Sequence, residues 1–205
     1  MMDKKKLLDE FFTRYGNRDN TPVLFFSPGR VNLIGEHTDY NAGYVLPCAL
    51  NFGTWLAIRK SGNETLRMES LNLPLKQSLS LSEIEKPIDG SWTNYPVGVV
   101  NEFIARGIQI SGMEMLFAGD IPNGAGLSSS ASIEMVMAVA LNHLFSANLD
   151  TMELVKLSQH AENSFVGMNC GIMDQFAVGF GKANSALFIN CGTLEYRITP
   201  FNPGK

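Results

Sequence analysis

The stretch from residue 120 to residue 132 constrains the fold of this chain more than any other part of the sequence. The apolar run 113–118 leads into it and is typical of a buried strand, whereas residues 133–145 follow it with the pattern of a helix. Gly124 and Gly126 permit a tight turn between the two, and three consecutive serines occupy the first turn of the expected helix. We therefore expect a strand, a loop and a helix here.

The start of this helix is a candidate phosphate site. A helix start presents unpaired backbone N–H groups and the positive end of the helix dipole, so it attracts anions. Glycines let the backbone approach a phosphate closely, and serine hydroxyls can bind phosphate oxygens or Mg²⁺. A simple helix cap is the alternative, but one serine would suffice for it. The lysine of the P-loop pattern is missing and Ser130 replaces the third glycine of the dinucleotide fingerprint, so the type of phosphate site stays open.

Composition limits the class of protein. With 205 residues, 45% of them hydrophobic and 18% charged, the chain is suited to one well-buried globular domain or to two small ones. Its formal net charge of −4 argues against a nucleic-acid or acidic-membrane surface. Three cysteines without metal spacing indicate reduced thiols, and no apolar run approaches the length of a membrane span. We expect a cytoplasmic protein without a nucleic-acid or membrane partner.

Helix and strand patterns mix irregularly along the chain. Besides the helix after the serines, helix patterns cover residues 3–16 and 94–106 and a segment that Asp150 opens with a capping arrangement to Glu153. Loops are expected at 73–90. Strand patterns lie at 23–26, where Ser27-Pro28-Gly29 is expected to end the strand, and at 31–33, 45–46, 54–59, 64–69, 113–118, 176–180, 186–189 and 194–198. Without a regular βαβ order, these patterns predict an α+β fold.

Charged side chains of several kinds concentrate between residues 28 and 47. Arg30, Glu36, His37 and Asp39 lie within ten residues, in a loop that also carries two glycines. Any one of them alone could be a solvated loop residue. Together they fit a polyol site better, because carboxylates and imidazole make directed hydrogen bonds to hydroxyls and arginine supplies a permanent positive charge.

Two carboxylates further along the chain are candidate site residues. Glu162 falls on the flank of a buried helix stripe, where an unpaired carboxylate would be costly. A basic side chain or a Mg²⁺ ion would each relieve that cost, and both alternatives stay open. Asp174 lies in a short polar break after this helix, where it is either a turn former or a general base near a metal. We expect His143 and His160 to be structural, because both lie on helix faces.

Three of these stretches resemble the galactokinase family. Residues 29–47 (GRVNLIGEHTDYNAGYVLP) closely resemble its characteristic motif, and residues 161–176 (AENSFVGMNCGIMDQF) resemble its catalytic stretch. Residues 122–132 (PNGAGLSSSAS) resemble the phosphate loop of the wider superfamily that includes homoserine, mevalonate and phosphomevalonate kinases, the GHMP kinases. Order and spacing agree over nearly the whole chain. The resemblance implies the N-terminal domain of the GHMP kinase fold (ribosomal protein S5 domain 2-like), a mixed sheet packed with helices.

The resemblance implies ATP-dependent phosphorylation of galactose at its anomeric hydroxyl, with Mg²⁺. Asp174 would take the proton of that hydroxyl, and Arg30 would stabilise the negative charge that develops during transfer. Ser129 and Glu162 would bind Mg²⁺. The other galactose hydroxyls would be held by Glu36, His37, Asp39 and Gly171. The ATP phosphates would be cradled by the backbone of Gly124, Ala125, Gly126, Leu127, Ser128, Ser129 and Ser130, and the adenine would lie near Trp92 and Tyr95, although core packing is an alternative for these two aromatics.

The resemblance also implies a missing part. Members of the family are longer, and their second half carries a further glycine-rich motif and a tyrosine that helps to hold the sugar. We therefore expect residues 1–205 to be the N-terminal galactose- and ATP-binding domain of a two-domain enzyme that is monomeric at full length, with its C-terminal domain absent from this chain. Asn163 stands where relatives usually carry histidine, and we expect this to change little.

Two alternatives to a galactokinase stay open. One is a kinase for a related sugar such as N-acetylgalactosamine or arabinose; Asp39 and its neighbours 38–41 favour plain galactose. The other is a sensor that binds galactose and ATP without catalysis. Sensor relatives lack a Ser-Ala pair from the serine run, whereas the run 128–132 is intact here, which favours the enzyme.

Overall fold

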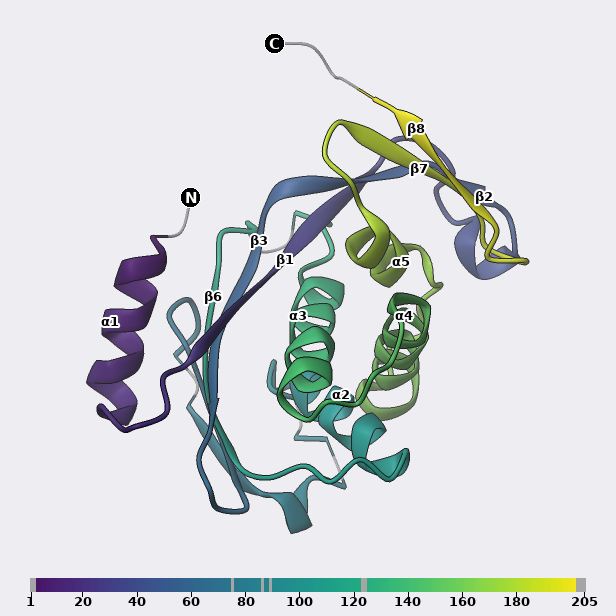
Figure 1. Ribbon diagram of the computed structural model, residues 1–205. Helices are drawn as coiled ribbons and strands as arrows, with labels where there is room; N and C mark the ends of the chain where they lie inside the picture. The colour runs from purple at the N-terminus through teal and green to yellow at the C-terminus, as the bar shows by residue number, and fades with distance from the viewer. Residues whose placement is uncertain (1–2, 75, 86, 89, 123–124, 202–205) are drawn as a thin grey trace.

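The computed structural model describes residues 3–74, 76–85, 87–88, 90–122 and 125–201, and it confirms the predicted α+β fold (Figure 1). A five-stranded mixed sheet has the order β1-β3-β6-β4-β5, and a three-stranded sheet has the order β2-β7-β8. The long strands β1 and β3 run from the first sheet toward the second (Figure 1). The strands are β1 (Val23–Asn32), β2 (Tyr44–Val45), β3 (Pro47–Lys60), β4 (Thr65–Ser70), β5 (Gln77–Ser80), β6 (Met113–Gly119), β7 (Ser185–Asn190) and β8 (Tyr196–Pro200).

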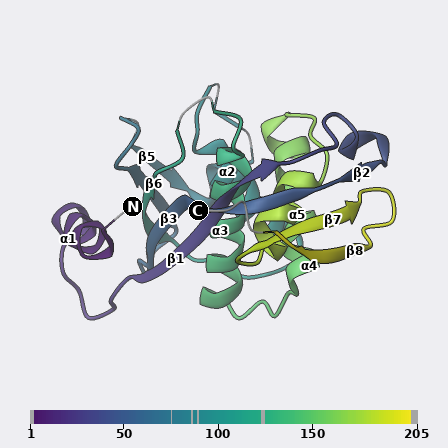
Figure 2. The same cartoon turned by 90° about the horizontal axis from the view of Figure 1, so that it is seen from above.

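Helices cover both faces of the large sheet. One face carries α1, and the other carries α2 to α5 (Figures 1 and 2). Of these, α3 and α5 contact β1 and β3 directly, whereas α2 packs against α3, and α4 packs against both α3 and α5. The helices are α1 (Lys4–Tyr15), α2 (Asn94–Ala105), α3 (Ser129–Leu144), α4 (Thr151–His160) and α5 (Met173–Phe180), with a π-helical turn η3 (Ala161–Val166) and two 3₁₀ turns, η1 (Asp39–Asn41) and η2 (Leu81–Glu83).

Strand β6 is buried on both faces. Met113, Met115 and Phe117 belong to the main core between the sheet and the helices α2 to α5, whereas Leu116 and Ala118 pack in a smaller cluster under α1. Fully burying a large apolar side chain stabilises a fold by about 1.5–3 kcal/mol. Burial on both faces explains why this strand is a continuous apolar run in the sequence.

The one charged residue of β6, Glu114, anchors the end of α1. Its side chain is 1% exposed, and it accepts hydrogen bonds from Arg59 Nε at 2.8 Å and Arg67 Nη1 at 3.0 Å. Arg59 Nη2 also donates to the backbone oxygens of Tyr15 and Gly16, each at 2.9 Å. Because a buried carboxylate is costly without partners, this network fixes the end of α1 to the sheet.

The predicted end of the first strand at residue 26 is wrong. Strand β1 continues through Ser27-Pro28-Gly29 to Asn32, with an irregular register against β3 between Pro28 and Arg30. Because β1 is an edge strand, a proline without an N–H group is tolerated next to such an irregularity. The continuation places Arg30 on a strand instead of in a loop.

The predicted strand at 176–180 is also wrong, because these residues form most of α5. A short apolar run fits a buried strand and a buried helix equally well, and here Phe176, Ala177 and Val178 are buried against the core. Asp174 therefore lies in the first turn of a helix. The region 73–90, expected to be loops, contains β5 and η2, while the other predicted helices and strands are confirmed with shifted ends.

In the described part of the chain, no helix has both the length and the apolar character needed to cross a membrane. The cysteines Cys48, Cys170 and Cys191 are all free. Burial raises the pKa of each thiol, that of Cys191 to about 11, so all three stay protonated and weakly nucleophilic at neutral pH.

Candidate active site

Asp174 in α5 has both carboxylate oxygens held by side chains from other elements. Arg30 Nε of β1 donates to Oδ1 at 2.7 Å, and the Ser128 hydroxyl, just before α3, donates to Oδ2 at 2.5 Å. The Arg30 side chain is 14% exposed and that of Asp174 is 25% exposed, so the ion pair is partly shielded from water. The predicted catalytic residues Asp174 and Arg30 are therefore in direct contact.

The glycine loop after β6 is tied to the same arginine. Arg30 Nη1 donates to the backbone oxygen of Gly126 at 2.7 Å, and the backbone N–H of Arg30 donates to Leu127 O at 3.2 Å. A Cβ atom on Gly29 would lie 2.9 Å from Leu127 O, so this glycine permits the close contact between strand and loop. Gly124, also predicted to contact phosphate, lies outside the described residues.

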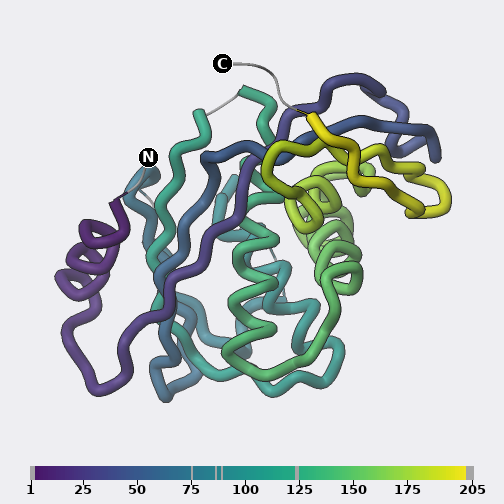
Figure 3. Tube along the Cα trace, turned by 45° about the horizontal axis from the view of Figure 1, so that its top comes forward, coloured from purple at the N-terminus to yellow at the C-terminus, as the bar shows by residue number. Residues whose placement is uncertain are grey.

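A cavity of about 450 Å³ opens beside the Asp174–Arg30 pair. A Cβ atom on Gly171 would lie 2.1 Å from Asp39 Oδ2, so only glycine lets that aspartate take this position. Figure 3 shows that the end of β6, the start of α3 and the loop after β1 lie at the same end of the molecule. The cavity is lined by all of the residues predicted to bind the sugar, Glu36, His37, Asp39 and Gly171, and by Ala125, Gly126 and Leu127 of the glycine loop.

The loop after β1 is held in shape by its own polar groups. His37 has a left-handed backbone with φ 61°, and its Nδ1 forms a 2.8 Å hydrogen bond with the Tyr40 hydroxyl. Asn32 Nδ2 donates to Glu36 Oε1 at 3.1 Å, and Asn41 Nδ2 donates to His37 O at 2.9 Å. These bonds orient the exposed side chains of Glu36 and His37 at the mouth of the cavity.

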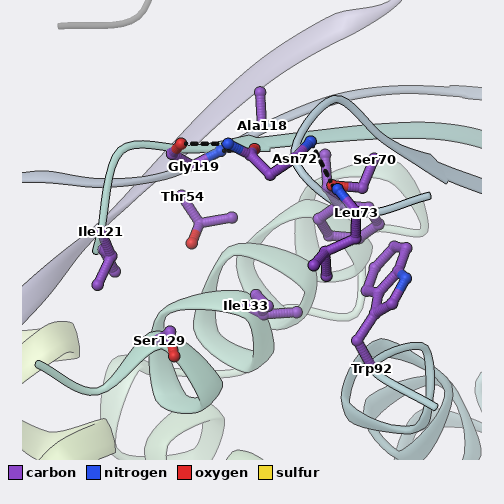
Figure 4. A pocket seen from close by; sticks show the side chains of 11 residues that line it. Thr54, Ser70, Asn72, Leu73, Trp92, Ala118, Gly119, Ile121, Ser129 and Ile133 are labelled. Carbon is purple, nitrogen blue, oxygen red and sulfur yellow. Dashed lines mark hydrogen bonds between the residues drawn. The ribbon is translucent and has the colours of Figure 1, made fainter. Parts of the chain in front are cut away.

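A second, smaller cavity of about 70 Å³ lies on the other side of the start of α3. Figure 4 shows Ser129 at one end of it and Trp92 at the other, with Ile133 of α3 between them. The buried Nε1–H of Trp92 has no hydrogen-bond partner within the described residues. Tyr95 is not among the residues that line this cavity.

Glu162, the predicted metal ligand, is 6% exposed within the π-helical turn η3. It accepts hydrogen bonds from Gln175 Nε2 at 2.6 Å and from the Cys170 thiol at 3.3 Å, and Gln175 Nε2 also donates to Glu134 Oε2 at 2.9 Å. Over the described ranges, no lysine or arginine forms an ion pair with Glu162, so the basic partner considered from the sequence is not found there.

Sequence reasoning missed Glu134 and Gln175, both 0% exposed. Burial, and next the neighbouring Glu162 carboxylate, raise the pKa of Glu134 to about 10, so Glu134 keeps its proton at neutral pH. The same two carboxyl groups act on Tyr95, whose pKa is raised first by burial and then by Glu162 and Glu134. A glutamate on the apolar face of α3 was the available signal in the sequence. This cluster contains no positive charge among the groups described here.

The surroundings of Glu162 fit a divalent cation. Among the residues that the structure describes, no group of three or more histidine, cysteine, aspartate or glutamate side chains could hold a metal by itself. Mg²⁺ does not need such a group, because it usually binds one or two carboxylates and completes its octahedron with substrate phosphates and water. A buried carboxylate without a basic partner among the described residues, linked through Gln175 to Glu134 of α3, suits that mode.

The remaining predicted residues have structural contacts. Asn163 clamps its loop, since its side chain accepts from Cys170 N at 2.9 Å and donates to Cys170 O at 3.3 Å. His160 Nδ1 pairs with Glu102 Oε1 at 2.7 Å, and the His143 ring packs edge-on against Phe25 at 5.7 Å between ring centroids. These contacts agree with the structural roles expected of the two histidines.

Known protein families match both sequence segments that contribute residues to the site. The family model described as galactokinase galactose-binding signature matches residues 9–60, and the model of the GHMP kinases N terminal domain matches residues 94–182. The galactokinase of Clostridium tetani is 51% identical over 205 residues. The chain resembles the N-terminal part of galactokinases. The match extends over 100% of this chain and 52% of the Clostridium tetani protein, so the chain spans about half the length of the curated relatives it matches.

Other galactokinases and solved structures agree. The Bacillus subtilis galactokinase is 48% identical over 203 residues, covering 97% of this chain and 52% of that protein. Lactococcus lactis galactokinase, crystallised in complex with galactose, superposes with a TM-score of 0.91 at 41% identity, over 96% of this chain and 51% of that one. The Methanococcus jannaschii mevalonate kinase, at 21% identity and a TM-score of 0.73 over 92% of this chain and 57% of that one, shows the shared GHMP kinase fold.

Proposed function

We propose that residues 1–205 are the N-terminal half of a galactokinase, which transfers the γ-phosphoryl group of MgATP to the anomeric hydroxyl of galactose and gives galactose 1-phosphate and ADP. One observation carries the proposal. The Asp174–Arg30 ion pair forms one wall of a cavity whose other walls carry Glu36, His37 and Asp39. The galactose complex of the Lactococcus lactis relative supports galactose as the sugar.

In the proposed reaction, Asp174 accepts a proton and Arg30 stabilises negative charge. The Asp174 carboxylate takes the proton of the anomeric hydroxyl as that oxygen bonds to the γ-phosphorus. The bond from the γ-phosphorus to the bridging oxygen breaks, and ADP leaves. Arg30, which hydrogen-bonds both Asp174 and the glycine loop, stabilises the charge on the transferring group. Because phosphoryl transfer depends on in-line placement and charge stabilisation, the main task of these residues is to hold both substrates in position.

The nucleotide is proposed to lie across the start of α3. Ala125, Gly126 and Leu127 line the sugar cavity, and Ser129 lines the cavity that ends at Trp92. Phosphates at the helix start would therefore lie between the two cavities, where backbone N–H groups favour anions. Trp92 packs near the adenine in this arrangement, and its indole N–H, which has no partner among the described residues, is available to the ligand.

Ser129 and Glu162 are the proposed magnesium ligands. Bound there, Mg²⁺ would neutralise charge on the β- and γ-phosphates. Gln175 Nε2 donates to one oxygen of Glu162 and is itself held by Glu134 of α3, which restricts the orientation of the Glu162 carboxylate.

A C-terminal half is proposed to complete the site and to make the full-length protein a two-domain monomer. The chain spans about half the length of its curated relatives. Apolar side chains are exposed on the loops that border the sugar cavity, with Ile34 66% and Met168 55% exposed. Such exposure next to a binding cavity is typical of a surface that another part of the protein covers. In the experiments below, "full-length protein" means residues 1–205 followed by this C-terminal half.

Sugar preference is the direct test of the proposed function. We expect the full-length protein to use galactose with a kcat/KM at least about tenfold above that for N-acetylgalactosamine or arabinose, because a site built around directed hydrogen bonds discriminates strongly between polyols. ADP release, measured in a coupled assay with each sugar at equal concentration, provides the comparison.

Each other outcome points to a different protein. A preference for N-acetylgalactosamine or arabinose would show a kinase for a related sugar. Galactose binding by calorimetry without any ADP release would show a sensor. Either result would refute the proposed galactokinase activity.

The metal assignment predicts a specific defect for Glu162→Gln. We expect this variant to need at least about tenfold more Mg²⁺ for half-maximal rate, because a neutral amide binds Mg²⁺ far more weakly than a carboxylate. Magnesium titrations of the full-length protein at saturating ATP and galactose measure the shift.

Glu64→Gln is the matched control, since it makes the same chemical change at an exposed residue outside the site. Its magnesium dependence should equal that of the unmodified protein. The same dependence in Glu162→Gln would mean that Glu162 only packs against Gln175 and is not a metal ligand.

A further inference from the structure

Ser128 has an unusual backbone for a serine. Its φ of 58° and ψ of 52° place it in the left-handed region, and it is 7% exposed. It occupies the N-cap position of α3, where a serine normally uses its side chain to accept a hydrogen bond from the helix backbone. No such bond forms here, because the hydroxyl instead donates to Asp174 Oδ2.

This arrangement gives up two ordinary sources of stability. Glycine would take the left-handed conformation at no steric cost, and a capping serine would stabilise the helix. Ser128 carries a side chain that is unfavourable in the left-handed region, and it does not cap the helix. Residues held in sparsely populated backbone regions cluster at functional sites, where the neighbouring structure determines them.

The left-handed residue also separates the hydroxyls of the serine run. The Ser128 hydroxyl contacts Asp174, while Ser129 lines the cavity that leads to Trp92. One turn further, the Ser132 hydroxyl donates to the backbone oxygen of Ser27 at 2.8 Å. The hydroxyls of Ser128 and Ser132 therefore have different partners, and it is the Ser128 hydroxyl that contacts the proposed base.

We infer that the Ser128 hydroxyl is a positioning group for Asp174. Arg30 Nε holds Oδ1 and Ser128 Oγ holds Oδ2, so the carboxylate cannot rotate about its Cβ–Cγ bond without losing a donor. A base must lie within hydrogen-bond reach of the proton that it removes, so a fixed carboxylate plane favours proton transfer. This inference rests on the proposed function, because only a reacting carboxylate needs such precise orientation.

A pair of substitutions separates the hydroxyl from the backbone. Ser128→Ala removes the hydroxyl and keeps a side chain that is unfavourable in the left-handed region, whereas Ser128→Gly removes the hydroxyl and favours that region. In the full-length protein, we expect both to lower kcat by about tenfold to a hundredfold, the range for losing a hydrogen bond to a charged group. The KM values for galactose and ATP should stay within about twofold, because neither substrate contacts this hydroxyl in the proposed arrangement.

Ser146 supplies a matched control at the other end of α3. It is an exposed serine with φ 51°, so Ser146→Ala and Ser146→Gly make the same two backbone changes away from the site. Both should leave kcat unchanged. At each position the melting temperature should be higher for the glycine variant than for the alanine variant, because glycine favours the left-handed region. This difference would verify that the Ser128 variants fold and that the left-handed backbone is kept.

The outcomes separate this inference from the proposed function. A Ser128→Gly variant with the same kcat as the unmodified protein would show that only the backbone conformation matters, and it would overturn the inference. Increases in the KM for ATP with unchanged kcat would overturn it as well, since the hydroxyl would then serve nucleotide binding. A full-length protein that releases no ADP with galactose, before any substitution, would instead refute the proposed function itself.

Discussion

Asp174→Asn in the full-length protein is expected to lower kcat by about a hundredfold to ten-thousandfold, the range for losing a general base. Asparagine has nearly the same shape as aspartate but cannot accept the proton of the anomeric hydroxyl. The positive charge of Arg30 and the side chains of Glu36, His37 and Asp39 remain, so galactose should still bind. Coupled ADP release gives the rate, and calorimetry gives the dissociation constant for galactose.

Asp19→Asn, at an exposed aspartate outside the site, controls for the change of charge and should leave the rate unaltered. Asp174→Ala should be as inactive as Asp174→Asn, although it leaves Arg30 without its ion-pair partner. Turnover near that of the unmodified protein in either Asp174 variant would remove this residue from its proposed role.

The 205-residue chain by itself is expected to bind galactose or MgATP weakly and to phosphorylate sugar at least about a hundredfold more slowly than the full-length protein. Its sugar cavity is bordered by loops with exposed apolar side chains, so one wall is open to water. Phosphoryl transfer depends on placement of the reacting atoms within a fraction of an ångström, and an open cleft loses that placement.

Joining residues 1–205 to the C-terminal half of the Clostridium tetani galactokinase should restore activity, because that relative is 51% identical over the same part of the chain. The rates of the 205-residue chain, of the joined protein and of the complete Clostridium tetani enzyme form the comparison. Rapid galactose phosphorylation by the 205-residue chain alone would show that this domain is sufficient and that the two-domain proposal is wrong.

Much of the candidate site could be predicted from the sequence because its residues lie in short motifs. Glu36, His37 and Asp39 lie within four consecutive residues of the loop after β1, and all three line the same cavity. The partner of that loop across the cavity, Gly171, is more than a hundred residues away and came from the family resemblance. Spacing along the sequence indicated which residues within one motif lie close together. The family resemblance was needed to predict that the separate motifs meet in one site.

The contacts that sequence reasoning missed all join distant segments. The Ser128 hydroxyl meets a carboxylate 46 positions along the chain, and Gln175 joins Glu134 of α3 to Glu162 of η3. Which of several adjacent serines faces Asp174 depends on the left-handed turn at Ser128, and serine itself does not predict that turn. Such contacts depend on backbone geometry that composition and periodicity do not contain.

The two wrong strand predictions have a common physical cause. Proline and glycine at 28–29 are ordinarily turn residues, but an edge strand with an irregular register admits them. The run 176–180 is uniformly apolar because the core surrounds it, which removes the periodicity that distinguishes a helix from a strand. In both cases tertiary context overrode the local pattern, and both errors fell on the elements that carry Arg30 and Asp174.

The contact between Gly171 and Asp39 has a consequence for redesigning the sugar preference of this protein. Any side chain at position 171 would overlap the aspartate, since even a Cβ atom would lie 2.1 Å from its Oδ2. Libraries of variants that change only the loop after β1 would therefore select only for sugars that fit a site with glycine at position 171. Libraries that vary position 171 alone would displace the Asp39 carboxylate from the wall of the sugar cavity. A smaller residue at position 39 would remove the overlap with Oδ2, but the same Cβ atom would lie 2.9 Å from the backbone nitrogen of Tyr40, so a change at 171 also requires the loop backbone to shift.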